Sequence, residues 1–312
     1  MKRVTRKTKE RREMVTGILF SLPAIIGFFC FALGPMVASL ILGFTEYTIS
    51  SAPRFVGLDN YIRMFSGQDV FFYQALSVTL KFALMNVAVC MLTAFAVALL
   101  LNSEAVKCRG LFRSVFYIPT IIPYVATAMI FMWMMSPDFG LFNILLRGIG
   151  LKGGKWIYSE GTVLYSLLII TAWTAGNIIV VFLAGLQGVP KQLYEAVEVD
   201  GGNGFHKFAY ITLPMVTPIV FFNGLMFMIA SLQGFMPAAV ITSGGPNNAT
   251  LFYTYYMYKQ AFEFSNMGYA SALGWVLFLV IALIAAFIFK TSKYWVFYSD
   301  EESRLCREER SS

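Results

Sequence analysis

The sequence has few charged residues. Only 13% of its 312 residues are Asp, Glu, Lys or Arg, whereas soluble domains contain roughly one quarter. Hydrophobic residues make up 58%, with 30 Phe, 16 Tyr and 5 Trp. A chain with so little charge is predicted to cross a lipid bilayer several times, with aromatic side chains near the interfaces. The net charge of +7 is therefore not taken as a sign of nucleic-acid binding.

Residues that usually perform catalysis or bind metals are scarce. There is one histidine, His206, and the four cysteines, Cys30, Cys90, Cys108 and Cys306, lack metal-ligand spacing. One histidine in a polar loop leaves no Ser/His/Asp constellation, and the apolar runs hold no carboxylate pair. We therefore expect no catalytic residue, no bound metal, no bound cofactor and no role for His206.

A nucleotide-binding loop is also missing. Gly153, Gly154 and Lys155 resemble part of a phosphate-binding loop. However, Ile149 occupies the position of its first glycine, and Trp156 that of the residue that binds magnesium. Any ATP and Mg²⁺ that drive this protein are thus expected in a separate subunit.

Long apolar runs predict six membrane-spanning helices. Each is long enough to cross about 30 Å of hydrocarbon at roughly 1.5 Å per residue. The first is too long for a secretory signal, and Pro23, Gly27, Gly34 and Pro35 are expected to kink it or allow close helix contact. Residues 46–73 are predicted to be an external connection with a short helix, and the turn residues at 242–250 to end the fifth span. The predicted spans are 14–45, 82–103, 114–137, 161–190, 214–237 and 264–289.

A polar island at 190–214 separates two of these spans. Pro190 suits the first turn of a helix, and Gly201 can close that helix in the left-handed conformation. The predicted helix has about three turns. Leu213 precedes a proline, so the next span is predicted to begin at Pro214. One face of the helix is expected to pack against the protein; it is formed by Leu193, Ala196, Val197 and Asp200. A second face is expected to be available to a partner; it is formed by Gln192, Glu195 and Val199.

Basic residues predict the orientation of the chain. With the amino terminus inside, the inner segments hold 17 of them and the outer segments six. Both termini and the polar island are therefore expected in the cytoplasm. The chain divides into a basic cytoplasmic tail at 1–13, a six-helix domain at 14–290 and a second cytoplasmic tail at 291–312.

The polar island matches a known motif. Glu195, Ala196, Gly201, Ile211 and the pair Leu213-Pro214 are spaced as in the EAA motif of permease subunits of binding-protein-dependent ABC importers, with Val197 in place of the second alanine. The segments Phe116–Asn143, Phe182–Ala196 and Thr242–Trp275 resemble carbohydrate-uptake permeases, specifically the larger, maltose-permease-like subunit of a heterodimeric pair. The resemblance implies an all-α polytopic membrane protein with the type I ABC importer permease fold.

This resemblance also implies partners and roles. The partners would be a second homologous permease, two copies of a cytoplasmic ATP-binding subunit, an extracellular or periplasmic solute-binding protein and a sugar, in a bacterial cell membrane. A cytoplasmic coupling helix would dock on the ATP-binding subunit, with Glu195 making the charged contact. The residues assigned to coupling are Glu195, Ala196, Val197, Asp200, Gly201, Leu213 and Pro214.

Polar residues within the spans are candidates for the transport path, because amides in hydrocarbon usually face the bundle interior. They are Asn86, Asn177, Asn223 and Gln233 with its neighbour Gly234, and Trp173 is able to stack on a sugar ring. Interhelical hydrogen bonding is an equally open role for each.

We expect uptake of an oligosaccharide or disaccharide. The alternatives are a self-contained secondary transporter or channel, for which the spans offer no ion-coupling site, and an ABC importer of another solute such as a glycerol phosphate ester.

Overall fold

The computed structural model describes residues 6–103 and 106–297. Most of the predicted carboxy-terminal tail, including Cys306, and the first five residues lie outside this range. The three-part division of the chain therefore stays a prediction. The described chain separates into two compact units, one of residues up to 69 with 257–277, and one of 70–256 with the residues from 278 onwards.

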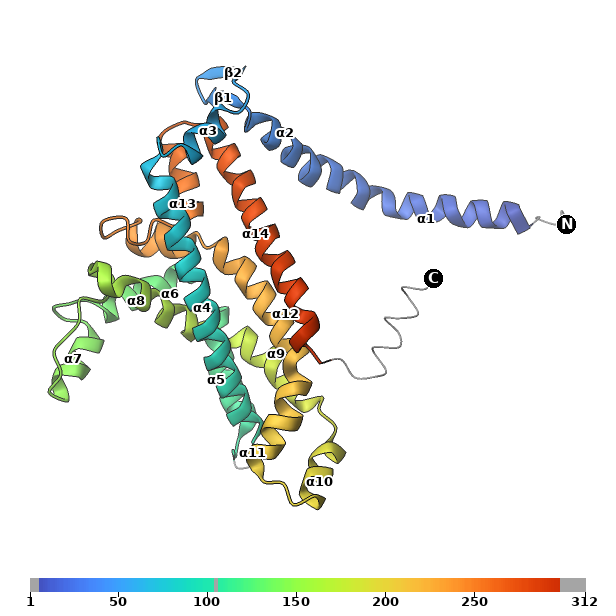
Figure 1. Ribbon diagram of the computed structural model, residues 1–312, viewed down its shortest axis with the longest axis vertical. Coiled ribbons are helices and arrows are strands. Elements are labelled where there is room, and N and C mark those ends of the chain that lie inside the picture. Colours follow the sequence, from blue (N-terminus) through green and yellow to red (C-terminus); the bar gives the residue numbers. More distant parts are fainter. Residues whose placement is uncertain (1–5, 104–105, 298–312) are drawn as a thin grey trace. The chain divides into compact units, whose positions relative to one another are not determined.

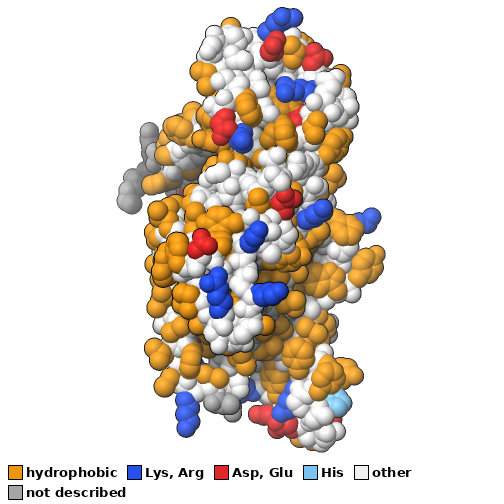
Figure 2. Space-filling model, turned by 90° about the vertical axis from the view of Figure 1, so that its left-hand side faces the viewer, with side chains coloured by type: hydrophobic (Ala, Val, Ile, Leu, Met, Phe, Trp, Pro, Cys, Tyr) orange, Lys and Arg blue, Asp and Glu red, His pale blue; other side chains and the backbone are white. Residues whose placement is uncertain are grey.

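The predicted fold class is confirmed, since the architecture is helical and apolar. In the described part of the chain, four helices are long and apolar enough to span a membrane, or up to six if each of two bent pairs forms one span. The four helices are Glu13–Leu42, Val70–Asn102, Gly204–Leu232 and Met267–Trp295. Figure 2 shows hydrophobic side chains spread over the whole length of one face of the molecule.

The first unit begins with an interrupted helix. Helix α1 (Arg6–Phe28) continues through a π-helical segment, η1 (Phe29–Leu33), into α2 (Gly34–Leu42). The wide π turn lies just before Pro35, where proline removes one main-chain hydrogen bond. A β-carbon at Gly27 would meet nothing within 4 Å in the described chain, whereas one at Gly34 would lie 3.0 Å from the carbonyl oxygen of Phe29.

A β-hairpin follows, which the sequence analysis did not predict. Strands β1 (Thr45–Thr48) and β2 (Ser51–Phe55) pair antiparallel, with Glu46 opposite Arg54. The turn lacks the Asn-Gly type of sequence that indicates hairpins, and β2 contains a proline and is fully exposed. The short helix expected in this connection is confirmed as α3 (Asp59–Phe65). The unit is completed by η5 (Lys259–Glu263) and the first part of α14 (Met267–Trp295).

The second unit contains the longest helix, α4 (Val70–Asn102). The prediction that this span starts at 82 was wrong, because Lys81 was taken as a boundary. The structure keeps Lys81 inside the helix and exposed. A single lysine is tolerated there because its long side chain can carry the ammonium group to the interface.

Two predicted spans are broken helices. The span predicted at 114–137 consists of α5 (Arg109–Ile121) and α6 (Tyr124–Met134), bent by 99°. The break falls where Ile122 is extended before Pro123, as residues preceding proline tend to be. The span predicted at 161–190 consists of α8 (Glu160–Trp173) and α9 (Gly176–Gln187), bent by 52°. The expectation of one continuous helix in each place was therefore wrong.

The boundaries of the last two spans also differ from prediction. Helix α12 (Leu213–Leu232) continues without interruption from α11 (Gly204–His206) and the π-helical η3 (Lys207–Thr212), so this span does not begin at Pro214. Leu213 is helical despite preceding a proline, because the π turn before it accommodates the lost hydrogen bond. Helix α12 ends at Leu232 rather than at 237, and α14 extends to Trp295 rather than to 289.

Shorter elements complete the second unit. They occupy the connection between α6 and α8, the polar island, and the region after α12. Residues 243–250 form a loop, but α12 already ends at Leu232, so the expectation that this loop ends the fifth span was wrong. The elements are α7 (Leu141–Gly148), η2 (Trp156–Tyr158), α10 (Lys191–Val199), η4 (Pro237–Thr242) and α13 (Tyr253–Tyr258).

The core of the second unit lies where α4, α9 and α12 pack together. Figure 1 shows these helices side by side, with α10 and α11 at the lower end of the unit. Helix α4 contributes small buried residues, Cys90, Ala94 and Ala98, which let larger side chains of α9 such as Phe182 approach closely. Val189, Tyr194 and Ile211 also pack against this core, so the polar island is attached directly to the helix bundle.

Candidate coupling site and transport path

The helix predicted in the polar island is confirmed as α10. It begins at Lys191, after Pro190 in an extended conformation, and ends at Val199. Gly201 follows with φ of +77°, the left-handed conformation that was expected. The amide of Gly201 donates to the carbonyl of Glu198 at 3.0 Å, and the amide of Gly202 to that of Val197 at 2.8 Å. These two bonds form a complete Schellman motif, which satisfies the free carbonyls at the end of the helix.

Gly202, which was expected only to help interrupt the helix, has a steric role that the sequence analysis did not predict. A β-carbon on Gly202 would lie 2.9 Å from the carbonyl oxygen of Val197 and would overlap the Val197 side chain. The signal was present in the Gly-Gly pair that follows the predicted helix. Gly201 therefore provides the left-handed turn, and Gly202 provides the room for it.

The packing face of α10 differs from the prediction. Leu193, Ala196 and Asp200 are exposed, whereas Val197 is half-buried. The second inward residue is Tyr194, whose hydroxyl lies 3.1 Å from the buried Thr212 hydroxyl and whose ring packs against the core. The face was misassigned because Tyr194 was not considered, although an aromatic residue gains more from burial than Leu193 or Asp200.

Glu195 points away from this attachment. Its side chain is exposed, and its carboxylate has no hydrogen-bond or ion-pair partner within the part of the chain that the structure describes. Ala196, next to it, is also exposed. The helix therefore presents a free carboxylate and a small side chain on a surface that nothing in this unit covers.

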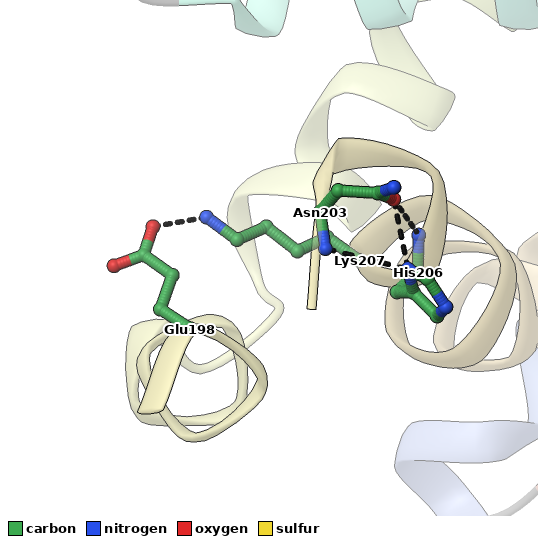
Figure 3. Close-up of polar contacts among 4 residues, drawn as sticks. All are labelled: Glu198, Asn203, His206 and Lys207. Carbon is green, nitrogen blue, oxygen red and sulfur yellow. Dashed lines mark hydrogen bonds and ion pairs between the residues drawn. The ribbon is translucent and has the colours of Figure 1, made fainter. Parts of the chain in front are cut away.

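Polar contacts fix the loop that follows α10 (Figure 3). Glu198 of α10 forms an ion pair with Lys207 of η3. The Asn203 side chain accepts from the amides of Phe205 and His206, at 3.0 and 3.2 Å, while the Asn203 amide donates to Nδ1 of His206 at 3.3 Å. This is a capping box at the start of α11. His206, to which no role was assigned, therefore takes part in capping the amino-terminal end of α11.

The remaining motif positions lie on the helix that leaves the loop. Ile211 is half-buried against the core of the unit. Leu213 is 42% exposed, and Pro214 lies one residue further on at the start of α12. The motif therefore combines an outward surface on α10 with inward packing at Ile211.

Four of the predicted path residues lie at helix breaks. Trp173 ends α8, is 40% exposed, and meets the ring of Phe131 edge-on at 5.3 Å. Asn177 is exposed in the first turn of α9. Gln233 and Gly234 lie where α12 ends, and the carbonyl of Gly234 accepts from the Thr254 hydroxyl at 2.7 Å.

One apolar cavity of about 210 Å³ adjoins the first of these breaks. Trp173 lines it, together with residues of α4, α5 and α9, whereas Gln233 and Gly234 do not. This cavity therefore does not bring the predicted path residues together.

The two buried asparagines have different surroundings. Nδ2 of Asn86 donates to the Ser231 hydroxyl at 3.0 Å, which links α4 to α12. Asn86 therefore serves interhelical packing, the alternative role considered for it. Asn223 is 7% exposed, and among the described residues its Nδ2 has no hydrogen-bond partner. Such a group is costly to leave unpaired, so Asn223 stays a candidate for the path.

The fold and these sites define a class of protein. Broken membrane helices around a packed bundle, with a rigidly mounted polar helix at one end, are the architecture of a multi-pass permease. The chain belongs to the family described as "Binding-protein-dependent transport system inner membrane component", whose model matches residues 91–293. It is thus a membrane component of a transport system, and members of this family are not themselves catalytic.

Curated relatives cover nearly the whole chain. The probable ABC transporter permease protein YesP of Bacillus subtilis (strain 168) is 40% identical over 296 residues, covering 94% of this chain and 95% of YesP. The arabinooligosaccharides transport system permease protein AraP of the same organism is 32% identical over 277 residues, covering 88% and 87%. The lactose transport system permease protein LacF of Rhizobium radiobacter is 32% identical over 293 residues, covering 91% and 96%.

A solved structure shares the fold. A chain in the crystal structure of a bacterial alginate ABC transporter, in complex with an alginate pentasaccharide-bound periplasmic protein, superposes with a TM-score of 0.79. The two chains are 24% identical, and the match covers 92% of this chain and 96% of the other. This similarity confirms the type I ABC importer permease fold predicted from the sequence.

Proposed function

We propose that this chain forms the membrane pathway of an ATP-driven importer for an oligosaccharide or disaccharide. A solute-binding protein delivers the sugar, a second homologous permease completes the pathway, and two copies of an ATP-binding subunit supply the energy. The observation that carries this proposal is that α10 exposes the unpaired Glu195 carboxylate while Tyr194 attaches the helix to the bundle. The cargo class is supported by the named substrates of AraP and LacF.

In this proposal α10 transmits work from the ATP-binding subunit to the membrane helices. Glu195, Ala196 and Asp200 form its exposed docking surface. Tyr194 and the Glu198–Lys207 ion pair then transfer the movement to η3 and α12. Because these links are polar contacts and packed rings rather than flexible loop, displacement of α10 moves the helices to which it is attached. ATP and Mg²⁺ are bound by the partner subunit.

The path for the sugar runs along the helix breaks. A break frees main-chain hydrogen-bonding groups at membrane depth, which is tolerated where those groups face a cavity or pathway. Trp173 supplies an aromatic face for a sugar ring, and the amides of Asn177 and Gln233 supply donors and acceptors. Gly234 has no side chain and so leaves space beside Gln233. Asn223 adds an unpaired side-chain Nδ2 within α12.

The cargo is tested by uptake into vesicles that contain the assembled transporter. With the binding protein and ATP present, we expect arabino-oligosaccharides, lactose or maltose to stimulate ATP hydrolysis and to accumulate. A peptide and a glycerol phosphate ester serve as non-carbohydrate controls. Stimulation by either control but by no carbohydrate would overturn the proposed cargo. Uptake by this chain without any co-purifying ATP-binding subunit would instead support a self-contained transporter or channel.

We also propose that the amino and carboxyl termini and α10 face the bacterial cytoplasm, on the basis of the distribution of basic residues. Cys108 is exposed between α4 and α5, on the same side in this arrangement. In a chain with Cys30→Ser and Cys306→Ser, a membrane-impermeant maleimide should label Cys108 only after cells are permeabilised, because Cys90 is buried. Labelling of Cys108 in intact cells would reverse the orientation.

A further inference from the structure

The connection between α6 and α8 carries a helix whose apolar side faces outward. In α7, Leu141, Ile144 and Leu145 are 38%, 56% and 60% exposed. Their spacing of three and four residues places them on one face of the helix. A surface helix in water has the opposite arrangement, with its apolar stripe toward the protein. The outward face of α7 therefore requires something other than water to cover it.

The inward face of α7 is held by a buried asparagine. Asn143 is 1% exposed, and its Nδ2 donates to the carbonyls of Pro137 and Gly154, both at 2.9 Å. Its Oδ1 accepts from the Gly154 amide at 2.9 Å and from Nε1 of Trp156 at 2.8 Å. These four bonds use the full capacity of the amide. Turning α7 over to bury its apolar face would break all of them, so the outward apolar face is a fixed feature.

The connection that contains α7 is also basic. Arg147, Lys152 and Lys155 are all exposed, and the sequence contains no acidic residue between Asp138 and Glu160. An apolar helix face bordered by basic residues is the composition of segments that lie in a membrane interface, where anionic headgroups attract the basic groups.

Exposed apolar residues also occur on both sides of α7 along the chain. Met129, Ile130 and Trp133 of α6 are 66%, 48% and 58% exposed. After α7, Ile149 and Leu151 are 73% and 55% exposed. Tryptophan is enriched at membrane interfaces, and Trp133 lies next to the end of α6. Exposed apolar residues before, within and after α7 favour lipid over a protein partner as the material that covers α7.

We propose that the segment 139–155 is an interfacial anchor. The apolar face of α7 lies at the boundary between acyl chains and headgroups, and Arg147, Lys152 and Lys155 contact the phosphates of anionic phospholipids. The hydrogen bonds of Asn143 hold the segment 139–155 at this depth. They thereby fix the depth of the adjoining helices α6 and α8 in the bilayer. This inference depends on the membrane location of the chain and is independent of its cargo.

The test places a fluorophore on α7 in the reconstituted full-length complex. Leu145→Cys is labelled in a background with Cys30→Ser, Cys108→Ser and Cys306→Ser, while the buried Cys90 is retained. Gln68→Cys, an exposed position between α3 and α4 that lies outside the segment 139–155, is labelled in the same way as the control. In vesicles of mixed phosphatidylglycerol and phosphatidylcholine, we expect bromine-bearing acyl chains to quench the label at 145 at least twofold more strongly than that at 68. Aqueous iodide should quench them in the opposite order.

Selectivity for anionic lipid is measured with the same label. Brominated phosphatidylglycerol should quench the label at 145 more than an equal fraction of brominated phosphatidylcholine, and Lys152→Gln with Lys155→Gln should abolish the difference. Equal iodide quenching at 145 and 68, with no bromolipid effect, would overturn the anchor. Protection of 145 from iodide only when the binding protein is added would also overturn it and would identify a docking face.

Discussion

Replacing Glu195 with alanine is expected to lower uptake by ten-fold or more while the chain still folds and inserts. The side chain is exposed, so the substitution removes little buried surface. Loss of one charge-assisted contact at the docking surface costs about 1.5 to 3 kcal/mol. That is enough to weaken attachment or coupling of the ATP-binding subunit by about ten-fold or more. The measurements are uptake, co-purification of the ATP-binding subunit and the amount of chain in the membrane.

Two further variants separate charge from structure. Glu195→Gln keeps the shape and hydrogen-bonding atoms but removes the charge, so an intermediate loss is expected. Glu46→Ala removes another exposed carboxylate, from the hairpin distant in sequence, and should leave co-purification unchanged. A Glu195→Ala chain with normal uptake and a normally bound ATP-binding subunit would show that the coupling contact lies on another residue.

Replacing Gly176 with alanine is expected to lower uptake severalfold, because the added side chain disturbs helix packing. Gly176 begins α9 at the break after α8 and is buried against α5. A β-carbon there would lie 2.5 Å from the carbonyl oxygen of Phe116, 2.8 Å from Cγ2 of Thr120 and 3.1 Å from Cα of Tyr117. Main-chain atoms cannot rotate out of the way as a side chain can, so α5 and α9 must separate. Overpacking of this kind costs typically about 1 to 3 kcal/mol.

The matched control for this substitution is Gly161→Ala in α8, where a β-carbon would meet nothing within 4 Å. Gly176→Ala should lower the midpoint of thermal unfolding in detergent and reduce uptake severalfold, whereas Gly161→Ala should change neither measurably. If the two variants behave alike, the contact between α5 and α9 at Gly176 does not limit stability or transport.

The local conformation of the polar island was predicted correctly where single residues specify it. Gly201 adopts the left-handed conformation expected of it, and α10 begins directly after Pro190. The orientation of α10 was predicted less well, because Tyr194 and Thr212 are separated by 18 residues and meet only in the folded chain. The roles of the motif residues in coupling, and of Trp173, Asn177, Asn223, Gln233 and Gly234 in the path, stay predictions.

The breaks in the helices illustrate a second limit. Pro123 gave a local signal for the break between α5 and α6, although a proline can equally be accommodated within a helix, as Pro23 and Pro218 are here. No comparable signal marks the break after Trp173, where Thr174 and Ala175 leave helical geometry. Both spans are apolar, and an apolar run indicates a span without showing where its helix breaks.

The sequence by itself determined that this is a multi-pass membrane protein with a polar helix between two of its spans. Hydrocarbon tolerates neither charge nor unpaired main chain, and spaced residues such as Glu195 and Gly201 specify a local motif. The tertiary structure alone decided where spans break, which face of α10 packs, and which amide is used for packing. Asn86 and Asn223 have the same chemistry in similar apolar runs, but only Asn86 has a hydroxyl, that of Ser231, placed opposite its Nδ2 by a neighbouring helix. Pairing across helices depends on contacts between residues far apart in the chain, which no local pattern specifies.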